Sequence, residues 1–424
     1  MKINLKITII FSMFGKNINL NMIPFAPPRI DDKIINKVIE TLKSGWITTG
    51  PNVKLFEEKL QKYTGTESVL CTSSATDGLE LILRWFGIGK GDEIIIPAYT
   101  YCATANVVIH CGAIPVMVDV NKNDFNISIN NIKNAITKKT KAIIPVDIGG
   151  LPCDYDEISR LINSPAVKSL FSPNNELQKK LGRILILADS AHSIGAVYKN
   201  KKIGKIADIT VFSFHAVKNL TTAEGGAVVL NLPDEFNNKE LKDFLKILGL
   251  HGQNKDALTK TKGNWKYDVI TAGYKINMTD IQAAMGLVEL ERYDNDTLKK
   301  RKWIFDYYSE NFEDDKRLIL PVYNNEEKKS SYHLYMLRIK DIDEEKRNII
   351  IKKITEKGVS VNVHFQPLPL LSFYKNLGYG IKDFPVAYDN YKCEISLPSF
   401  YDMTEEMLKK VIDSVTKSVN EVLK

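Results

Sequence analysis

Apolar residues recur at helical spacing in two segments near the N-terminal end of the chain. The stretch "IDDKIINKVIETLKSG" (residues 30–45) ends on a glycine, and "NVKLFEEKLQKYTG" (52–65) follows a short loop. Apolar positions three and four residues apart line one face of a helix, and glycine commonly follows a helix end. Both segments are therefore predicted to be helices.

From about residue 67 the pattern changes to short apolar runs that alternate with helical stretches. The runs "EIIIP", "KAIIPVDI", "ILILAD" and "ADITVFSF" are nearly continuous in apolar residues. Parallel strands that are covered on both faces have this composition. Strands that alternate with helices are typical of a doubly wound domain. We predict an α/β fold with a large, mostly parallel sheet.

The texture changes again after about residue 290. A long helical stretch leads to "SYHLYMLRI" (331–339), "GVSVNVHF" (358–365) and a helical C-terminal segment, which together suggest a small α+β domain. We divide the chain into an extension (1–22), a large domain (23–300) and a small C-terminal domain (301–424). The boundary is placed between about 290 and 320. Residues 163–181 are polar and turn-rich and are predicted to be a surface insertion.

Charge and cysteine content narrow the function classes. The 58 basic and 51 acidic residues give a formal net charge of +7, but they are interleaved, without a basic block that carries aromatic residues. We therefore predict no nucleic-acid partner. Five scattered cysteines without a C-x-x-C pair fit a reducing cytoplasm. The sequence predicts neither a disulfide framework nor a metal site.

The first 21 residues hold lysines and a short apolar run over residues 7–14. That run is far below the roughly 20 residues that span a bilayer, and no small-residue cleavage site follows it. We interpret residues 1–21 as a loose extension, or Met22 as the functional start. A membrane or export role is the alternative.

Two loops that follow predicted strands carry residues suited to a flat, phosphorylated ligand. In open parallel sheets, ligands bind beyond the carboxyl ends of the strands. "CTSSATDGLEL" leads small hydroxyl residues into a helix, whose free N–H groups can bind phosphate. Ordinary N-capping by Ser74 or Thr76 is the alternative. In "IIIPAYTYCATAN", Tyr99 and Tyr101 offer rings that could stack on a cofactor or simply pack in the core.

Two further loops carry charged residues next to apolar runs. Asp189 follows "ILILA", and a buried aspartate is costly unless a positive group meets it; a salt bridge or helix cap is the alternative. Lys218 lies in "SFHAVKNLTTAEGG". In a closed pocket, a lysine can lose its charge and become nucleophilic, as Schiff-base chemistry requires. The alternative is an ordinary surface lysine on a loop, which is the more frequent case. A phosphate cradle, a stacking ring, a carboxylate and an amine together fit pyridoxal phosphate.

Ordered motifs run along the chain from Ile23 to the C-terminus. They are "SGWITTGP", "SSATDGL", "GIGKGDEIIIPAYTY", "TKAIIPVDIGG", "ADSAHSIGA", "FSFHAVKNLTTAEGGAVV", "AGYKINMTDIQAAMG" and "ISLPSFYDMTEE". On these motifs the chain resembles the DegT/StrS family of pyridoxal-phosphate sugar aminotransferases, which have the type I aminotransferase fold. The likeness is greatest to the bacterial UDP-4-amino-4-deoxy-L-arabinose aminotransferases.

The resemblance implies a set of site residues. Lys218 would carry the cofactor, and Asp189 would pair with its pyridine nitrogen. Roles in binding the cofactor fall to Tyr101 as the stacking ring, to His192 beside it, and to Ala75, Thr76 and Ser213 at the phosphate. Relatives are homodimers whose partner subunit completes the site through the "AGYKINMTD" loop. There Lys275 stands where many relatives carry asparagine, and it could reach the phosphate. His333 and His364 resemble the family's contributions to the sugar-nucleotide pocket.

The resemblance also implies a reaction. L-Glutamate would donate its amino group, through the cofactor, to a nucleotide-linked 4-keto sugar, with UDP as the nucleotide, for lipopolysaccharide, capsule or glycan synthesis. A dTDP-linked 4-keto-6-deoxyhexose is an alternative substrate. A dehydratase using the same cofactor is an alternative enzyme, although such relatives carry histidine where this chain has Lys218. A binding protein without catalysis is the non-enzymatic alternative.

Overall fold

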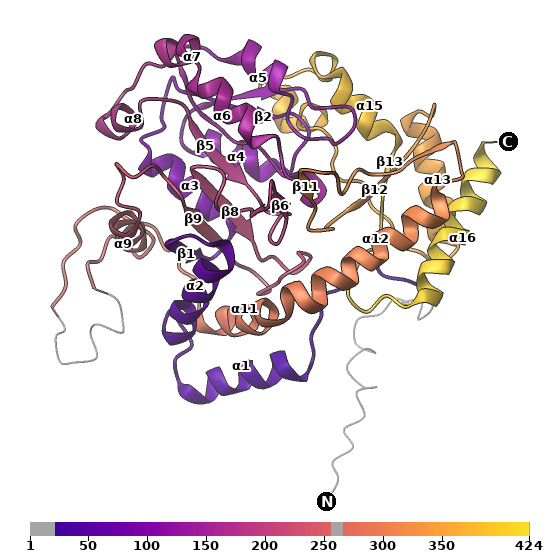
Figure 1. The fold of residues 1–424 in the computed structure, drawn as a ribbon, viewed down its shortest axis with the longest axis horizontal. Helices are drawn as coiled ribbons and strands as arrows, with labels where there is room; N and C mark the ends of the chain where they lie inside the picture. The colour runs from indigo at the N-terminus through magenta and orange to yellow at the C-terminus, as the bar shows by residue number, and fades with distance from the viewer. Residues whose placement is uncertain (1–21, 256–265, 424) are drawn as a thin grey trace, which may run out of the picture.

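A seven-stranded sheet forms the centre of the large domain (Figure 1). The structure, a computed structural model, describes residues 22–255 and 266–423. In spatial order the strands are β1 (Ser68–Thr72), β9 (Gly226–Leu230), β8 (Ile209–Ser213), β5 (Leu185–Asp189), β4 (Thr140–Ile143), β2 (Glu93–Pro97) and β3 (Ile114–Val118). Strand β9 runs antiparallel to β1 and β8, and the pairs from β8 to β3 are parallel. The mostly parallel α/β sheet predicted from the sequence is confirmed.

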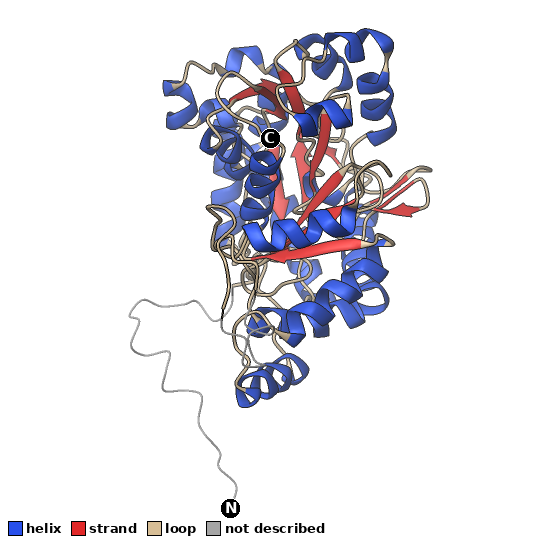
Figure 2. Ribbon diagram, turned by 90° about the vertical axis from the view of Figure 1, so that its left-hand side faces the viewer, coloured by secondary structure: helices blue, strands red, loops and turns tan. Residues whose placement is uncertain are grey.

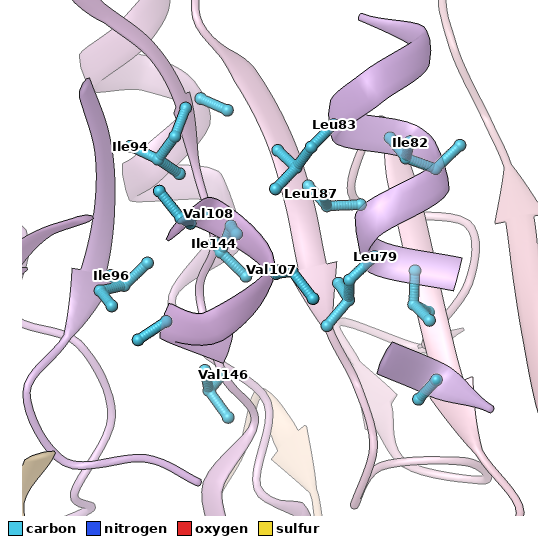
Figure 3. Packing of buried hydrophobic residues seen from close by; sticks show 14 of the residues in the cluster. Leu79, Ile82, Leu83, Ile94, Ile96, Val107, Val108, Ile144, Val146 and Leu187 are labelled. Atoms are coloured by element: carbon cyan, nitrogen blue, oxygen red, sulfur yellow. The ribbon is translucent and has the colours of Figure 1, made fainter. Parts of the chain in front are cut away.

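Apolar side chains cover both faces of this sheet. Along β2, Ile94 and Ile96 belong to one core cluster and Ile95 to the other. Figure 3 shows the first of these clusters, where Leu79, Val107 and their neighbours on two helices pack over the strands. Because each strand buries both faces, its sequence is continuously apolar, as the short runs indicated.

Helices enclose the sheet in two layers (Figure 2). One core cluster takes residues from α3 (Ala75–Trp85), α4 (Cys102–His110), α8 (Glu176–Leu181) and α9 (Asn238–Leu248). The other takes residues from α2 (Pro51–Thr64), α5 (Ile129–Ala135), α6 (Tyr155–Asn163), α7 (Pro165–Leu170) and α11 (Asp280–Arg292). Helix α1 (Asp32–Ser44) begins where the Asp31 side chain accepts from the Ile34 amide, and it ends before Gly45, whose φ is 77°. Helices α1 and α2 confirm the two predicted N-terminal helices.

The C-terminal domain is a small α+β unit, as predicted. A three-stranded antiparallel sheet of β10 (Leu318–Ile319), β12 (Tyr335–Ile339) and β13 (Glu394–Leu397) packs with α12 (Leu298–Phe312), α13 (Glu344–Glu356) and α16 (Glu405–Val422). Helices α14 (Ser372–Asn376) and α15 (Pro385–Cys393) connect these elements. A small sheet of β6 (Val197–Tyr198), β7 (Lys201–Lys202) and β11 (Lys328–Lys329) joins this part of the chain to the large domain.

Two segments differ from their sequence patterns. The alternating stretch 358–365 forms isolated bridges at Val359 and Asn362 rather than a strand. The polar stretch 163–181 is not a plain surface insertion, because it folds into α7 and α8. Gln178 of α8 is fully buried and donates a hydrogen bond to the Phe86 carbonyl. Polar composition alone hid this packing.

The boundary predicted at 300/301 falls inside a continuous helical path. Helix α11 runs through a π-helical turn, Tyr293–Thr297, into α12, and Figure 1 shows these helices along one side of both domains. Ile23 pairs with Val359 and packs in the core of the small domain. Apart from Met22, the predicted N-terminal extension lies outside the described residues.

Candidate active site

The carboxyl ends of the parallel strands open into a cavity of about 450 Å³. Its walls come from the loops after β1, β2, β5 and β8 and from the small domain. Nine of the ten predicted site residues line it: Ala75, Thr76, Tyr101, Asp189, His192, Ser213, Lys218, His333 and His364. The cavity size falls within the range of about 300–1,000 Å³ that small-molecule sites occupy.

Asp189 is the last residue of β5 and is buried at the floor of the cavity. Its carboxylate accepts from the Thr104 hydroxyl at 2.8 Å and from the Ala191 amide at 3.2 Å. Burial raises the pKa of Asp189, although these bonds and the charge of Lys218 act in the opposite direction. A buried carboxylate of this kind favours a positive partner, such as a protonated ring nitrogen.

Lys218 enters the cavity from the turn that follows β8. Its amide donates to the His215 carbonyl at 2.9 Å, which fixes the start of that turn. Burial lowers the pKa of Lys218 to about 8, against the attraction of the Asp189 carboxylate. A much larger fraction of this amine is therefore neutral near pH 8 than of a solvent-exposed lysine, whose pKa is about 10.4. Loss of charge makes it a nucleophile and a proton acceptor.

The first turn of α3 meets the start of β9 beside the cavity. Ser74 caps the helix by accepting from the Asp77 amide at 3.0 Å, so the N–H groups of Ala75 and Thr76 lie in the open first turn. A Cβ atom on Gly226 would lie 2.5 Å from the Ala75 amide nitrogen, so the close approach requires glycine. The N-cap by Ser74, which was the alternative to a phosphate site, is present. It leaves the N–H groups of the first helical turn available to an anion.

Aromatic rings line the wall beyond Asp189. The His192 ring lies 4.4 Å from that of His333 and stacks on Phe365 at 5.8 Å with an interplanar angle of 18°. His192 Nδ1 is buried without a hydrogen-bond partner among the described residues. Burial, with the charge of Lys218, holds the pKa of His192 well below its usual value. Tyr101 is 60% exposed, with its ring 5.9 Å from Phe365.

His333 is held by Asn219, the residue that follows Lys218 in the sequence. Asn219 donates its amide to the Ser331 carbonyl at 2.7 Å, so its oxygen faces His333 Nδ1 at 2.8 Å. Nδ1 must therefore carry the ring proton, which leaves Nε2 as an acceptor. Burial keeps the pKa of His333 well below its usual value. Arg301 donates to the Tyr332 and His333 carbonyls, both at 2.8 Å, and fixes this segment.

His364 reaches the cavity from the loop before α14. Its ring stacks on Phe25 at 5.4 Å with an interplanar angle of 21°. Burial and the charge of Lys218 lower the pKa of His364 to about 4. The ring is therefore neutral at physiological pH and offers a hydrogen-bonding edge rather than a charge.

Lys275 is the predicted site residue that this chain does not bring into its own cavity. It is exposed, its ammonium group donates to the Asn277 side chain, and its backbone bridges to Leu250. A role for Lys275 at the phosphate of a partner's cofactor stays a prediction.

Several positioning residues escaped sequence reasoning. Thr104 contacts Asp189 across 85 positions of sequence, and Asn219 contacts His333 across 114. The helical spacing between Tyr101 and Thr104 was a signal that both face the same sheet edge. Arg301 and Phe365 gave no comparable signal, because the partners of Arg301 lie more than 30 positions away and those of Phe365 lie in the other domain.

Thr104→Val is expected to lower kcat/KM about 10- to 100-fold, the effect of losing one hydrogen bond to a charged group. Valine keeps the shape but removes the donor to Asp189. Thr100→Val is the matched control, because Thr100 contacts Thr104 at 2.9 Å and does not touch the carboxylate. Steady-state kinetics of both variants checks this; equal losses would contradict a specific role of Thr104.

The residues present fit pyridoxal phosphate. Asp189 is a buried carboxylate on the cavity floor, the start of α3 is a helix end that can bind phosphate, and His192 Nδ1 has no hydrogen-bond partner in the part of the chain that the structure describes. Lys218 supplies an amine with lowered pKa. By contrast, the described parts of the chain contain no cluster of three residues that could hold a metal ion.

Comparison with known proteins agrees with this geometry. The profile of the DegT/DnrJ/EryC1/StrS aminotransferase family matches residues 28–171 and 173–416. The chain belongs to this family. An uncharacterised protein of Methanocaldococcus jannaschii is 41% identical to this chain over 406 residues, which cover 95% of this chain and 98% of that protein. The spore coat polysaccharide biosynthesis protein SpsC of Bacillus subtilis is 36% identical, over 93% of this chain and 96% of that protein.

Solved structures of sugar aminotransferases have the same fold. Spr1654 of Streptococcus pneumoniae, described as a sugar aminotransferase, matches in its PMP form with a TM-score of 0.91 at 44% identity, over 94% of this chain and all of that one. Its PLP form gives a TM-score of 0.90. Helicobacter pylori PseC, an aminotransferase of pseudoaminic acid biosynthesis, gives 0.81 at 29% identity, over 94% and 100% of the two chains. The chain is thus a pyridoxal-phosphate-dependent aminotransferase.

Proposed function

We propose that this aminotransferase moves the amino group of L-glutamate to the 4-keto group of a nucleotide-linked sugar, giving a 4-amino sugar nucleotide. The observation that carries the proposal is the meeting of Lys218 and Asp189 with the neutral rings of His333 and His364 in one cavity. The first two groups serve the cofactor. The two rings come from the small domain and offer hydrogen-bonding edges to a polyhydroxylated substrate.

Each residue then has a chemical task. The cofactor, when bound, supplies an electron sink through which an amino group and a proton pass from donor to acceptor. The Lys218 amine takes the proton from the carbon that bears the amino group and later returns it to the sugar carbon. Asp189 holds a proton at the pyridine nitrogen, steadied by the Thr104 hydroxyl. His192 and Tyr101 would hold the ring between them, and the start of α3 with Ser213 would bind the phosphate.

The substrate class follows from the relatives and the motifs. SpsC is named for polysaccharide biosynthesis and PseC for pseudoaminic acid biosynthesis. A product that enters lipopolysaccharide, capsule or another surface glycan is consistent with both. The motif likeness to UDP-4-amino-4-deoxy-L-arabinose aminotransferases favours UDP. A dTDP-4-keto-6-deoxyhexose differs by a methyl group in the sugar, a contrast worth only about 1–3 kcal/mol in a pocket. The free cysteines favour a cytoplasmic location.

The experiment is a two-step spectroscopic assay. Purified protein loaded with pyridoxal phosphate is mixed with L-glutamate, and the absorption band of the lysine-bound cofactor should shift as 2-oxoglutarate forms. UDP- and dTDP-linked 4-keto sugars are then added in parallel, and one of them should restore the first band. A dehydratase would leave the band unchanged by glutamate, and a binding protein would give no band at all. Either result would overturn the proposal.

We further propose that the working form is a homodimer with shared sites. Helix α1 exposes Ile35, Ile39 and Leu42 at helical spacing, each at least 40% exposed. The loop after this stripe is tied to the Lys275 segment, since Thr49 donates to the Met278 carbonyl at 2.6 Å. Arg301 also lines the cavity, but its guanidinium group already donates hydrogen bonds to two backbone carbonyl groups. A phosphate-binding charge from the partner's Lys275 would complete the site.

Mixing Lys218→Ala with Lys275→Ala protein tests shared sites. In a mixed dimer one site carries both changes and the other carries neither, so random re-pairing should restore about a quarter of wild-type sites. Specific activity and cofactor affinity are measured after the dimers have exchanged subunits. Activity equal to the average of the two separate variants would mean that each chain completes its own site.

A further inference from the structure

Three side chains of the small domain form a hydrogen-bonded chain that ends at the active-site cavity. Glu394 and Ser396 lie on β13 and are fully buried. The Ser396 hydroxyl lies 2.5 Å from Glu394 Oε1 and 3.0 Å from His364 Nδ1. The His364 ring lines the cavity, and no described residue pairs with its Nε2. A buried carboxyl group is thus linked through a hydroxyl group to a ring that lines the cavity.

The direction of these hydrogen bonds depends on the protonation of Glu394. A serine hydroxyl has one proton and donates to one neighbour. When Glu394 is ionised, Ser396 donates to it and accepts from His364 Nδ1–H, so Nε2 is a bare acceptor. When Glu394 is protonated, it can donate to Ser396, which then donates to Nδ1, and the ring proton moves to Nε2. One added proton on Glu394 therefore reverses the direction of both hydrogen bonds, the one between Glu394 and Ser396 and the one between Ser396 and His364.

We propose that Glu394, acting through Ser396, sets which nitrogen of His364 carries the ring proton and so switches Nε2 between acceptor and donor toward the substrate. Glu394 and Ser396 are positioning residues, and His364 makes the contact. The switch itself is a property of the protein alone, whereas its effect on the sugar rests on the proposed function. A donor at Nε2 suits a keto or other carbonyl oxygen, and an acceptor suits a hydroxyl group.

The electrostatics place this switch near neutral pH. Burial raises the pKa of Glu394 to about 8, against the hydrogen bonds from Ser396 and the His364 amide and the charges of Arg347 and Arg338. The low pKa of His364 keeps the ring neutral over the same interval. The hydrogen bonds from Glu394 to His364 can therefore reverse their direction while the imidazole ring stays neutral.

Of the other groups near these three side chains, Tyr99 and Cys393 have raised pKa values, whereas Lys218, which lines the same cavity as His364, has a pKa of about 8 as well. Tyr99 donates to the His364 carbonyl at 2.6 Å, and burial raises its pKa well above the ordinary value. Burial also raises the pKa of Cys393. Arg347 donates to the Glu394 carbonyl at 3.1 Å. We assign the change of the His364 tautomer between about pH 7 and 9 to Glu394, and Glu394→Gln, which leaves Lys218 in place, separates it from the titration of Lys218.

Nitrogen-15 NMR of the histidine rings tests the switch in the full chain without cofactor. The chain has six histidines, so the His364 signals can be assigned by their loss in His364→Gln. In the wild type, the ring proton should move from Nε2 to Nδ1 as the pH rises through about 8. In Glu394→Gln the side-chain amide donates to Ser396, so the proton should stay on Nε2 at every pH.

Two variants of Ser396 distinguish loss of the hydrogen-bond relay, formed by Glu394, Ser396 and His364, from loss of the fold. Ser396→Thr keeps the hydroxyl and should keep the switch, whereas Ser396→Ala should abolish it. A wild-type tautomer that does not change between about pH 7 and 9, or a switch that persists in Glu394→Gln or Ser396→Ala, would overturn the proposal. Thermal melting curves identify any variant that fails to fold, and Ser396→Thr then serves as the folded reference.

Kinetics tests the consequence for the substrate. KM for the keto sugar should change across the same pH interval in the wild type and in Ser396→Thr, and it should be flat in Glu394→Gln. The half-reaction with glutamate should not follow this profile. An NMR switch with no effect on KM would overturn the substrate contact. A protein that does not react with glutamate at all would overturn the proposed function and leave the switch standing.

Discussion

Lys218→Ala is expected to lower the rate of transamination by about 10³-fold or more, because it removes both the amine that carries the cofactor and the base that moves the proton. Lys218 is the lysine that lines the cavity, and burial has already lowered its pKa to about 8. The measurement is single-turnover reaction with glutamate, followed by the cofactor absorption band. The cofactor should still bind through the remaining contacts but without the band of the lysine-bound form.

The control for Lys218 is a lysine far from the site. Lys90 is exposed and precedes β2 at the opposite edge of the sheet, so Lys90→Ala should leave the rate unchanged. A second readout uses pH: the rate at which cofactor-free protein captures pyridoxal phosphate should rise up to about pH 8 and then level off, since above this pH the amine is neutral. An ordinary lysine would show that rise near pH 10. A Lys218→Ala variant that retains the lysine-bound band would contradict the assignment.

The core of the site could be predicted because its signals are local. Asp189 follows an apolar run and Lys218 follows another, and parallel strands bring both to the same sheet edge. The supporting contacts could not be predicted in this way. Ser396 touches His364 across 32 positions and Thr104 touches Asp189 across 85, and nothing in either segment names its partner. Such pairs are fixed only when distant segments of one domain pack together.

The same contrast holds for the fold. Continuous apolar runs predicted the strands of the large sheet, because burial on both faces leaves a strong pattern. The stretch 358–365 alternates like a strand, but it lies between Ile23 and Ser396 and makes only isolated bridges. Its residues serve the cavity, where Phe365 stacks on His192 and His364 joins the relay. In this stretch, the alternation of apolar and polar residues reflects partial burial of the side chains and not regular strand pairing.

Asp189→Asn is expected to lower kcat about 10³-fold while leaving the fold intact. Asparagine keeps the size of the side chain but has no negative charge to hold a proton at the pyridine nitrogen, so the electron sink is lost. Burial raises the pKa of Asp189, which means that the folded chain disfavours its charge. The cofactor-free variant should therefore melt at the wild-type temperature or above it. The half-reaction with glutamate and thermal melting give the two readouts.

Comparison with Thr104→Val decides what Asp189 does. Thr104→Val keeps the carboxylate and removes one hydrogen bond to it, so its loss of kcat should be smaller by at least about tenfold. If Asp189 acted only by holding Ala191 and Thr104 in place, Asp189→Asn would cost stability and both variants would lose similar activity. A large loss of kcat in a chain that melts normally requires the negative charge itself. That result would show that the buried carboxylate of Asp189, whose charge is costly in the cofactor-free protein, is needed for the function of the cofactor.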